Sequence, residues 1–406
     1  MTKQDKVELK RSLSLPMITL YGLGTTIGAG IYALIGEIAG IAGYFSPFSF
    51  LLASILAGFT ALSFAEFSSR FPKAAGAALY VEKGFGVSWF STAIGLLVVF
   101  AGLVSSAALI NGLHNHLQEI LPSSRISIIL IVTLTLGLIA AWGVIESVMV
   151  AAIVTLIEIG GLILVIGVSW DAYSTLPERW HELIPTADLF SWNAIFLGVT
   201  LAFYAFIGFE DMVDSAEEVV DAKRKLPVAI MLTLLVTTCL YVLLALGAVL
   251  SVEPSQLAEA NAPLAYIFEL NSGYSSRVLV IIGMFAIING ALIQIIMASR
   301  VLYGLSSRGK LHSKLSYINP HTRTPLIATA VACILTLTLA LIGNLSLLAK
   351  ITSLIMLTVF SIVNLSLYRV KLKTPTPTDA IIFPRWISLA GFIISSGFIL
   401  MELSKI

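Results

Sequence analysis

The chain of 406 residues is too apolar and too weakly charged for a water-soluble protein, with 58% hydrophobic and 12% charged residues. Ordinary soluble domains contain about 45–50% apolar and about 25% charged residues. The formal net charge of +1 provides no polyanion-binding surface, so no nucleic-acid partner is expected. Because a helix that spans a bilayer needs about 20 apolar residues, the composition predicts an all-α polytopic membrane protein.

Apolar runs separated by short polar loops predict about eleven transmembrane helices along the chain. Each run is long enough, or nearly long enough, to cross the hydrocarbon core of a bilayer. The predicted spans are residues 16–40, 45–68, 87–115, 126–143, 148–169, 191–218, 227–251, 276–305, 325–343, 346–368 and 383–403.

The loops on the two sides of these spans differ strongly in positive charge. With the N-terminal tail (residues 1–12) inside, 19 of the 24 lysine and arginine residues fall on that side and five on the other. Cytoplasmic loops of membrane proteins carry the excess of lysine and arginine. We therefore expect a multi-pass protein of the cell (inner) membrane with a cytoplasmic N-terminus and, after eleven spans, a C-terminus outside.

Two of the predicted spans carry features that interrupt a helix. The first span contains Gly28, Ala29 and Gly30 near its middle, and the sixth contains Gly208 followed by several acidic residues. Interrupted segments at corresponding positions of two halves are the best sequence indication of a transporter binding site. The alternative for the first span is close helix packing through small residues, which the spacing of Gly24 and Gly28 also fits.

A pair of interrupted helices suits a zwitterionic ligand. Unpaired backbone N–H groups and the positive end of the helix dipole favour a carboxylate where a helix restarts. Unpaired carbonyl groups favour an ammonium group or another cation where a half-helix ends. The sequence therefore predicts a binding site for a molecule such as an amino acid.

Four segments resemble the motifs of amino acid permeases of the amino acid–polyamine–organocation superfamily. GTTIGAGIY in the first span resembles the pattern G-x-x-x-G-[SAT]-G-I-[FY] of that family. ALSFAEFSSRFPKAAGAALYVEKGFG, FYAFIGFEDMVDSAEEVVDAKRKLP and SRVLYGLSSRGKLH are similar to the family blocks of helices 2, 6 and 8. The segments follow the family order and spacing over residues 13–370.

The resemblance implies the leucine-transporter fold, in which two inverted five-helix repeats surround a central site. The repeats would be residues 13–170 and 190–370, and residues 380–403 would form one extra helix. It also implies secondary active transport by alternating access, with no enzymatic activity. Two departures from the family pattern are Ala75-Gly76 in place of Gly-Gly, and Ala78 in place of an aromatic residue.

The resemblance also implies roles for residues around both interruptions. Backbone amides of the first interruption would bind a substrate carboxylate, and carbonyl groups of both would hold the amino group. Tyr204 matches an aromatic position that can cover the site, whereas Phe206 and Phe209 either face the substrate or pack. The predicted substrate-binding residues are Thr26, Ile27, Gly28, Ala29, Gly30, Tyr204, Ala205, Phe206, Ile207 and Gly208.

Glu158 lies near the middle of the fifth predicted span, where an acid costs about 2.5–3.5 kcal/mol on insertion scales. Many proton-coupled relatives carry a lysine in this part of helix 5. We interpret Glu158 as a proton-binding site, or alternatively as a ligand for Na⁺ or for a basic substrate. The competing interpretation is a neutral acid that is hydrogen-bonded to a neighbouring helix.

Glu210 directly follows the second interruption and matches an acid proposed to couple proton and substrate in some relatives. Its alternative role is to cap the half-helix that restarts there. Asp211, Asp214, Glu217 and Glu218 are expected to form a solvated cytoplasmic gate or a salt-bridge face. Glu66 and Arg70, at positions i and i+4, predict an interfacial ion pair. Further candidates for the site or for interhelical hydrogen bonds are Ser105, Ser106, Asn289, Gln294, Thr352 and Ser353.

No nucleotide-binding, metalloprotease or hydrolase motif occurs in a usable context, so we expect no enzyme, no cofactor and no metal site. The primary prediction is an amino acid transporter that works by proton-coupled symport or by exchange, with Na⁺ as the alternative coupling ion. A carrier of cationic amino acids or polyamines is a second possibility. A non-transporting amino acid sensor on the same fold is a third. The sequence does not predict an oligomeric state.

Overall fold

The computed structural model describes residues 13–73, 76–118, 121, 124–142, 148–185, 189–307, 309–319, 322, 324–374 and 380–404. The predicted N-terminal tail, residues 1–12, lies outside the described residues. Within the described ranges the elements are all helices, and the only β-type pairing is an isolated bridge between Leu13 and Val219. The predicted all-α class is confirmed.

Each predicted span corresponds to a helix, and the end points differ by at most five residues except in one case. The predicted span 191–218 is an α-helix only as far as Tyr204 and continues through turns into a short 3₁₀ helix that ends at Ser215. Seven stretches are long and apolar enough to cross a membrane, and the first, Leu15–Arg70, contains two helices. Three shorter apolar helices match the remaining spans. The helices are α1 (Leu15–Ala42), α2 (Ser46–Arg70), α4 (Ser88–Gln118), α5 (Arg125–Trp142), α6 (Val148–Val168), α9 (Leu189–Tyr204), α10 (Ala222–Ser251), α13 (Arg277–Ser307), α14 (Leu326–Ile342), α15 (Leu345–Lys373) and α16 (Arg385–Leu403).

Several short helices in the connections were not predicted. Three of them begin with a proline in the first turn, namely Pro177, Pro254 and Pro263. Proline favours this position because its missing N–H group has no partner there in any helix. The short helices are α3 (Gly76–Phe85), α7 (Trp170–Ser174), α8 (Leu176–Leu183), α11 (Pro254–Glu259) and α12 (Pro263–Ser272).

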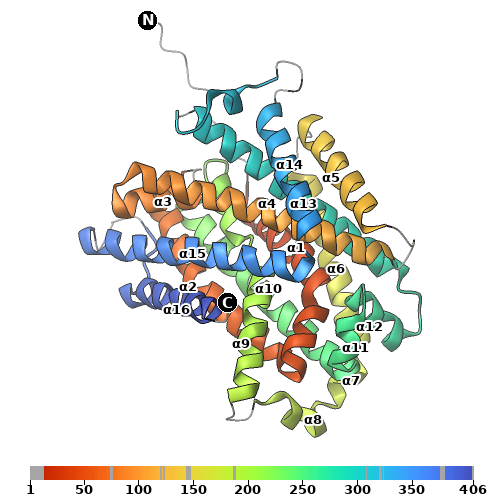
Figure 1. Cartoon of the computed structure of the whole chain (residues 1–406). Coiled ribbons are helices and arrows are strands. Elements are labelled where there is room, and N and C mark those ends of the chain that lie inside the picture. The colour runs from red at the N-terminus through yellow and green to blue at the C-terminus, as the bar shows by residue number, and fades with distance from the viewer. Residues whose placement is uncertain are drawn as a thin grey trace, which may run out of the picture.

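The interrupted helix α1 lies at the centre of the molecule (Figure 1) and packs against α6, α9, α10 and α13. Around it, α2 runs along α10, and α4 packs against both α13 and α15. The side chains between these helices are apolar and fully buried, as at Phe64, Phe203 and Phe360. On the outer helices large apolar side chains remain exposed, as expected of a surface that meets lipid.

The predicted pair of Glu66 and Arg70 is present, and it is more deeply buried than an interfacial pair. Arg70 donates to Oε1 of Glu66 through Nε at 2.9 Å and Nη2 at 2.7 Å, and the two side chains are at most 3% exposed. Lys371 at the end of α15 binds Oε2 of the same carboxylate at 2.6 Å. The backbone N–H of Phe383 also donates to Oε2, which joins α2, α15 and the segment before α16. A buried carboxylate requires such partners, because an unpaired charge is costly to bury.

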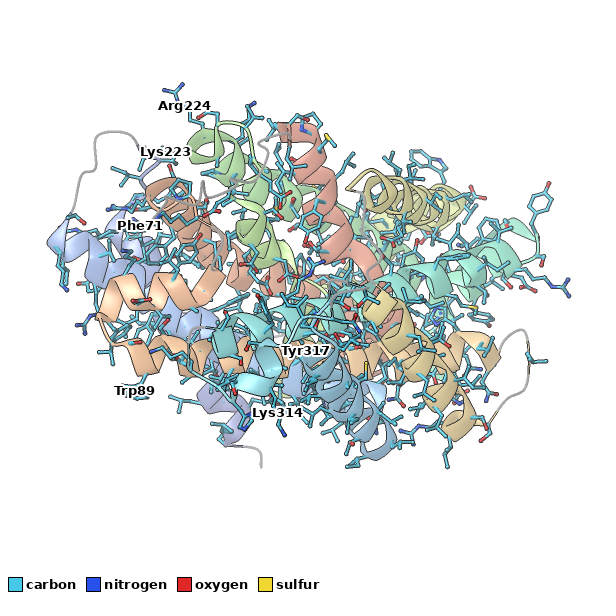
Figure 2. The ribbon with its side chains drawn as sticks, turned by 90° about the horizontal axis from the view of Figure 1, so that it is seen from above. Phe71, Trp89, Lys223, Arg224, Lys314 and Tyr317 are labelled. Carbon is cyan, nitrogen blue, oxygen red and sulfur yellow. The ribbon has the colours of Figure 1, made fainter. Side chains whose placement is uncertain are left out.

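The first turn of α10 carries exposed positive side chains, and Lys223 and Arg224 project away from the body of the molecule (Figure 2). The carbonyl oxygen of Lys223 accepts a hydrogen bond from Ser69 Oγ at the end of α2. The ends of α2 and α15 and the start of α10 therefore lie on one side of the protein. We call this side the basic face.

Candidate binding site between two interrupted helices

The first interruption is at Gly28, where α1 leaves helical geometry with φ 0° and ψ −123°. A Cβ atom on Gly28 would have open space around it, whereas one on Gly24 would overlap Thr155 of α6. Packing through small residues therefore explains Gly24 but not Gly28. The interruption was predicted at the correct place.

The second interruption follows Tyr204, where α9 ends and residues 205–208 form turns. Gly208 has φ +132°, a backbone conformation that side chains strongly disfavour, and a Cβ atom there would overlap the carbonyl oxygen of Thr25. The chain continues as a 3₁₀ helix, η2 (Phe209–Ser215), where the sequence predicted a restarted half-helix. This tighter element brings acidic residues close to the break.

The two interruptions contact each other directly. Thr25 Oγ1 donates a hydrogen bond of 3.0 Å to the carbonyl oxygen of Gly208. A Cβ atom on Gly30 would lie 2.8 Å from Cα of Ala205, so glycine is needed for this close approach of the two backbones. The sequence pattern indicated both glycines but not their pairing partners, which lie about 180 residues away along the chain.

Tyr241 of α10 connects both interruptions and was not predicted. Its hydroxyl group lies 3.0 Å from the carbonyl oxygens of Thr26 and Ala205 and 3.3 Å from that of Ile27. Thr26, Ile27 and Ala205 were expected to present these carbonyls to an amino group, and in this conformation they face Tyr241 instead. A single tyrosine in an apolar run was the only sequence signal.

A small cavity of about 40 Å³ lies between the two interruptions, α4 and α13. Such a space holds only a few water molecules, and we call the site closed in the sense that it is no larger than this. Tyr204 lies at the cavity and shares a 2.8 Å hydrogen bond with Ser105 of α4. Oγ1 of Thr26 is buried and has no hydrogen-bond partner among the described residues. The lining residues are Thr25, Thr26, Gly28, Gly30, Ser105, Leu109, Tyr204, Ile207, Gly290 and Gln294.

The predicted binding residues divide into two groups. Thr26, Gly28, Gly30, Tyr204 and Ile207 line the cavity, as do the candidates Ser105 and Gln294. Ile27, Ala205, Phe206 and Gly208 belong to the interruptions but are not part of the lining described for the cavity, and the side chain of Ala29 lies outside the described residues.

The aromatic residues beside the second interruption serve in packing. The ring of Phe206 contacts that of Tyr241 edge to face, with 5.1 Å between centroids. The ring of Phe209 packs against Phe64 of α2 and Phe360 of α15. These contacts fix the walls of the interruption and leave Tyr204 as the aromatic side chain at the cavity.

Glu158 lies on α6 with its side chain 1% exposed, behind the interruption of α1. Neither carboxyl oxygen has a hydrogen-bond partner within the described part of the chain. The hydrogen bond to a neighbouring helix that the competing interpretation requires is therefore not made. The hydroxyl groups of Tyr32 and Tyr241 are close enough to interact electrostatically with Glu158. The backbone carbonyl oxygen of Glu158 accepts a 2.7 Å hydrogen bond from the hydroxyl group of Tyr32, so the residue lies against the second half of α1.

Glu210 accepts a 2.8 Å hydrogen bond from the backbone N–H of Gly208 through Oε2. This bond caps the start of η2, as one of the two interpretations predicted. Glu210 also lines a second cavity, which shares Ser105, Ile207 and Gln294 with the first and is bounded by Thr352. Glu210 therefore stabilises the backbone at the second interruption and also lines the cavity next to the central one.

Further cavities continue from there past Asp211 and Asp214. Asp214 lies against Gly76 at the start of α3, in the loop region that follows Arg70 on the basic face. None of the ion pairs found in the described ranges contains Asp211, Asp214, Glu217 or Glu218. The predicted salt-bridge face is thus not formed in this conformation.

Comparison with known proteins agrees with this arrangement. The family profile described as "Amino acid permease" matches residues 13–403. The chain is 31% identical over 391 residues to "Cationic amino acid transporter 2, vacuolar" of Arabidopsis thaliana, covering 91% of this chain and 61% of the relative. It is 27% identical over 390 residues to "Branched-chain amino acid permease BcaP" of Bacillus subtilis, and this match covers 90% of this chain and 82% of the relative. The chain spans 61% to 64% of the length of the first three plant relatives.

A solved structure with the same fold is "MhsT in complex with L-phenylalanine". It superposes with a TM-score of 0.67 at 14% sequence identity and covers 97% of this chain and 98% of that one. This similarity establishes the leucine-transporter fold that the sequence resemblance implied. By the match of its family profile over nearly the whole chain, the protein belongs to the amino acid permease family of the amino acid–polyamine–organocation superfamily.

Proposed function

We propose that the protein is a secondary active transporter that moves amino acids across a membrane by alternating access. The observation that carries the proposal is the meeting of two interrupted helices, at Gly28 and Gly208, around a closed cavity. Interrupted helices at membrane depth are tolerated where they line such a cavity. The names of the relatives, which include a branched-chain amino acid permease, support the same function.

The backbone of the first interruption is the proposed binding site for the substrate carboxylate. N–H groups of Gly28, Ala29 and Gly30 suit a negative group at the start of the second half of α1. Carbonyls of Tyr204 and Ile207 remain candidates for the ammonium group. Those of Thr26, Ile27 and Ala205 share the single proton of Tyr241, and each carbonyl oxygen has a second lone pair that could accept from the ammonium group.

We propose Glu158 and Glu210 as the acids that link transport to an ion gradient, with H⁺ as the first candidate and Na⁺ as the second. The carboxyl group of Glu158 is buried without a hydrogen-bond partner among the described residues, and Glu210 accepts a hydrogen bond from the N–H of Gly208. Glu210 therefore contacts the second interruption, and Glu158 lies on α6, which packs against the interrupted helix α1. A change in the charge of either acid would alter the surroundings of the binding site directly.

Uptake into proteoliposomes tests this function. The purified protein should accumulate radiolabelled leucine or lysine when a proton or sodium gradient is imposed, and liposomes without protein should not. The same substrates should raise the melting temperature of the protein in detergent. Absence of both uptake and stabilisation across the amino acids would overturn the proposal.

A carrier for cationic amino acids or amines is a second candidate. It is favoured by the acids that line the connected cavities, Glu210, Asp211 and Asp214, and by the names of the plant relatives. Competition between lysine and leucine in the uptake assay separates the two candidates, because a cationic carrier would be inhibited by lysine at much lower concentration.

A further inference from the structure

We call the cavity of about 40 Å³ between the two interruptions the central cavity. The part of its lining that does not belong to the interruptions comes from α4, with Ser105 and Leu109, and from α13, with Gly290 and Gln294. The groups proposed to bind the carboxylate and the ammonium group of a substrate are backbone atoms of the interruptions. An amino acid that is held there by both charged ends therefore directs its side chain toward α4 and α13.

The helices α4 and α13 are closely joined beside this part of the lining. Ser106 donates a 3.0 Å hydrogen bond through Oγ to the carbonyl oxygen of Ala291, and both residues are at most 1% exposed. A Cβ atom on Gly102 would lie 2.8 Å from Oε1 of Gln294 and 3.0 Å from Cε of Met297, so glycine lets these side chains pack directly on the backbone of α4. A substrate side chain therefore cannot extend between the two helices at this level.

The available volume limits the length of that side chain. The central cavity measures about 40 Å³, and the second cavity, which shares Ser105, Ile207 and Gln294 with it, measures about 10 Å³. One water molecule needs about 10–15 Å³, so even a small amino acid requires some widening. Each further methylene group requires more, and widening at α4 and α13 works against the hydrogen bond between Ser106 and Ala291. The site therefore favours a short substrate side chain.

Gln294 indicates the chemistry of that side chain. Its amide group lines the central cavity and forms no hydrogen bond with another residue in the described part of the chain. An amide both donates and accepts hydrogen bonds, as a hydroxyl group does. Leu109 and Ile207 line the same cavity and provide apolar contacts. A hydroxyl group on a short aliphatic side chain satisfies both kinds of neighbour.

We propose that the central cavity selects an amino acid with a short hydroxyl side chain, serine or threonine, and that Gln294 recognises the hydroxyl group. This selectivity rests on the proposed function, because it takes the interruptions as the binding site for the charged ends of the substrate. It differs from the substrates that the names of the relatives give, which are cationic and branched-chain amino acids. Leucine and lysine bind more weakly, because their longer side chains must widen the site.

Titration calorimetry on the purified full chain tests the proposal by comparing serine with alanine, which differ only in the hydroxyl group. A hydrogen bond of this kind changes affinity about two- to twelvefold, so serine should bind more tightly than alanine by that factor. Gln294→Leu removes the amide and keeps an apolar side chain of moderate size, so serine and alanine should then bind with equal affinity. Leucine and lysine should bind to the unchanged protein about tenfold more weakly than serine, since overfilling a packed site is unfavourable.

Gln256→Leu is the matched control, because Gln256 is exposed on α11 and does not line the central cavity. It should keep the preference of the unchanged protein for serine over alanine. Melting temperature and gel filtration show whether each variant is folded. The comparison of serine, alanine, leucine and lysine on the unchanged protein does not depend on any variant.

Three results would overturn the proposal. Alanine binds to the unchanged protein as tightly as serine, Gln294→Leu keeps the preference for serine, or leucine or lysine binds as tightly as serine. In each of these results amino acids still bind, so the proposed function stands while the selectivity is wrong. If no amino acid binds to the unchanged protein, the proposed function itself is wrong, and the selectivity that rests on it is wrong as well.

Discussion

At the scale of single residues, Glu158 of α6 and Tyr241 of α10 are buried polar side chains on the helices that pack against the interrupted helix α1. Glu158 is recognisable in the sequence because an acid in a long apolar run is costly to insert into a membrane and is therefore rare. Tyr241 does not stand out, because a tyrosine in a membrane helix is compatible with many surroundings. Its role depends on carbonyl groups of residues more than 200 positions earlier and 36 positions earlier. Such contacts follow from the fold and not from local sequence.

Replacing Glu158 by Gln should remove the dependence of uptake on a pH gradient. Glutamine keeps the size of the side chain but cannot exchange a proton, so uptake with an inward proton gradient should fall to the level seen without one. The measurement is proteoliposome uptake at several imposed gradients. Glu178→Gln, an exposed acid of α8, is the control and should change nothing. An unchanged response to the gradient in Glu158→Gln would end its assignment as the coupling acid.

Replacing Tyr241 by Phe should weaken substrate binding. The ring can keep its edge contacts with Phe206 and Phe50, while the carbonyls of both interruptions lose a donor. A hydrogen bond of this kind contributes about 0.5–1.5 kcal/mol, so affinity should fall about two- to twelvefold.

Tyr173→Phe is the control for this substitution. Tyr173 donates a 2.9 Å hydrogen bond to the carbonyl oxygen of Leu243 and not to a residue of either interruption. Titration calorimetry with the best substrate should find its affinity unchanged. Equal effects of the two substitutions would show that Tyr241 acts only through general stability.

At the scale of elements, the spans followed from apolar runs and the interruptions from glycine. The runs located each long helix because burial in lipid requires a continuous apolar stretch. The sequence did not reveal that η2 would be a 3₁₀ helix, because its acids are compatible with either kind of helix. The short helices α8, α11 and α12 were not predicted, because segments this short do not show a helical apolar period, and a proline in the first turn was the only local signal.

Gly208→Ala should abolish substrate binding while the protein still folds. The added methyl group meets the carbonyl oxygen of Thr25, and φ +132° is unfavourable for alanine. The two interruptions must therefore separate. Binding is measured by thermal stabilisation with substrate.

Gly160→Ala on α6 is the matched control, because a Cβ atom there has open space. Alanine favours a helix over glycine by up to about 1 kcal/mol, so this variant should bind substrate normally and melt at the same or a higher temperature. Normal binding by Gly208→Ala would show that the close contact with Thr25 is not needed.

At the scale of the whole molecule, the fold class followed from composition and the family motifs, and comparison with solved structures establishes it. The closed state of the central cavity did not follow from the sequence. One sequence must be compatible with every conformation of a transport cycle, and the loop charges and motifs do not choose among them. The boundaries of the two proposed repeats, 13–170 and 190–370, stay a prediction.

The orientation in the membrane is a prediction that labelling can test. After both native cysteines are replaced by serine, Lys223→Cys at the start of α10 should react with a membrane-impermeant maleimide only in inside-out vesicles. Tyr274→Cys, at an exposed position (75%) between α12 and α13, should react in intact cells. The reverse pattern would place the basic face outside.

Tyr241 has one proton and three carbonyl oxygens within reach. The proton can transfer its hydrogen bond from one acceptor to another by rotation about the C–O bond, with no movement of the ring. The two interrupted backbones can therefore slide past each other by small amounts while the hydroxyl group always keeps one partner. Because the hydroxyl group keeps a hydrogen bond throughout, α1 and α9 can move relative to each other at this contact with little cost in free energy.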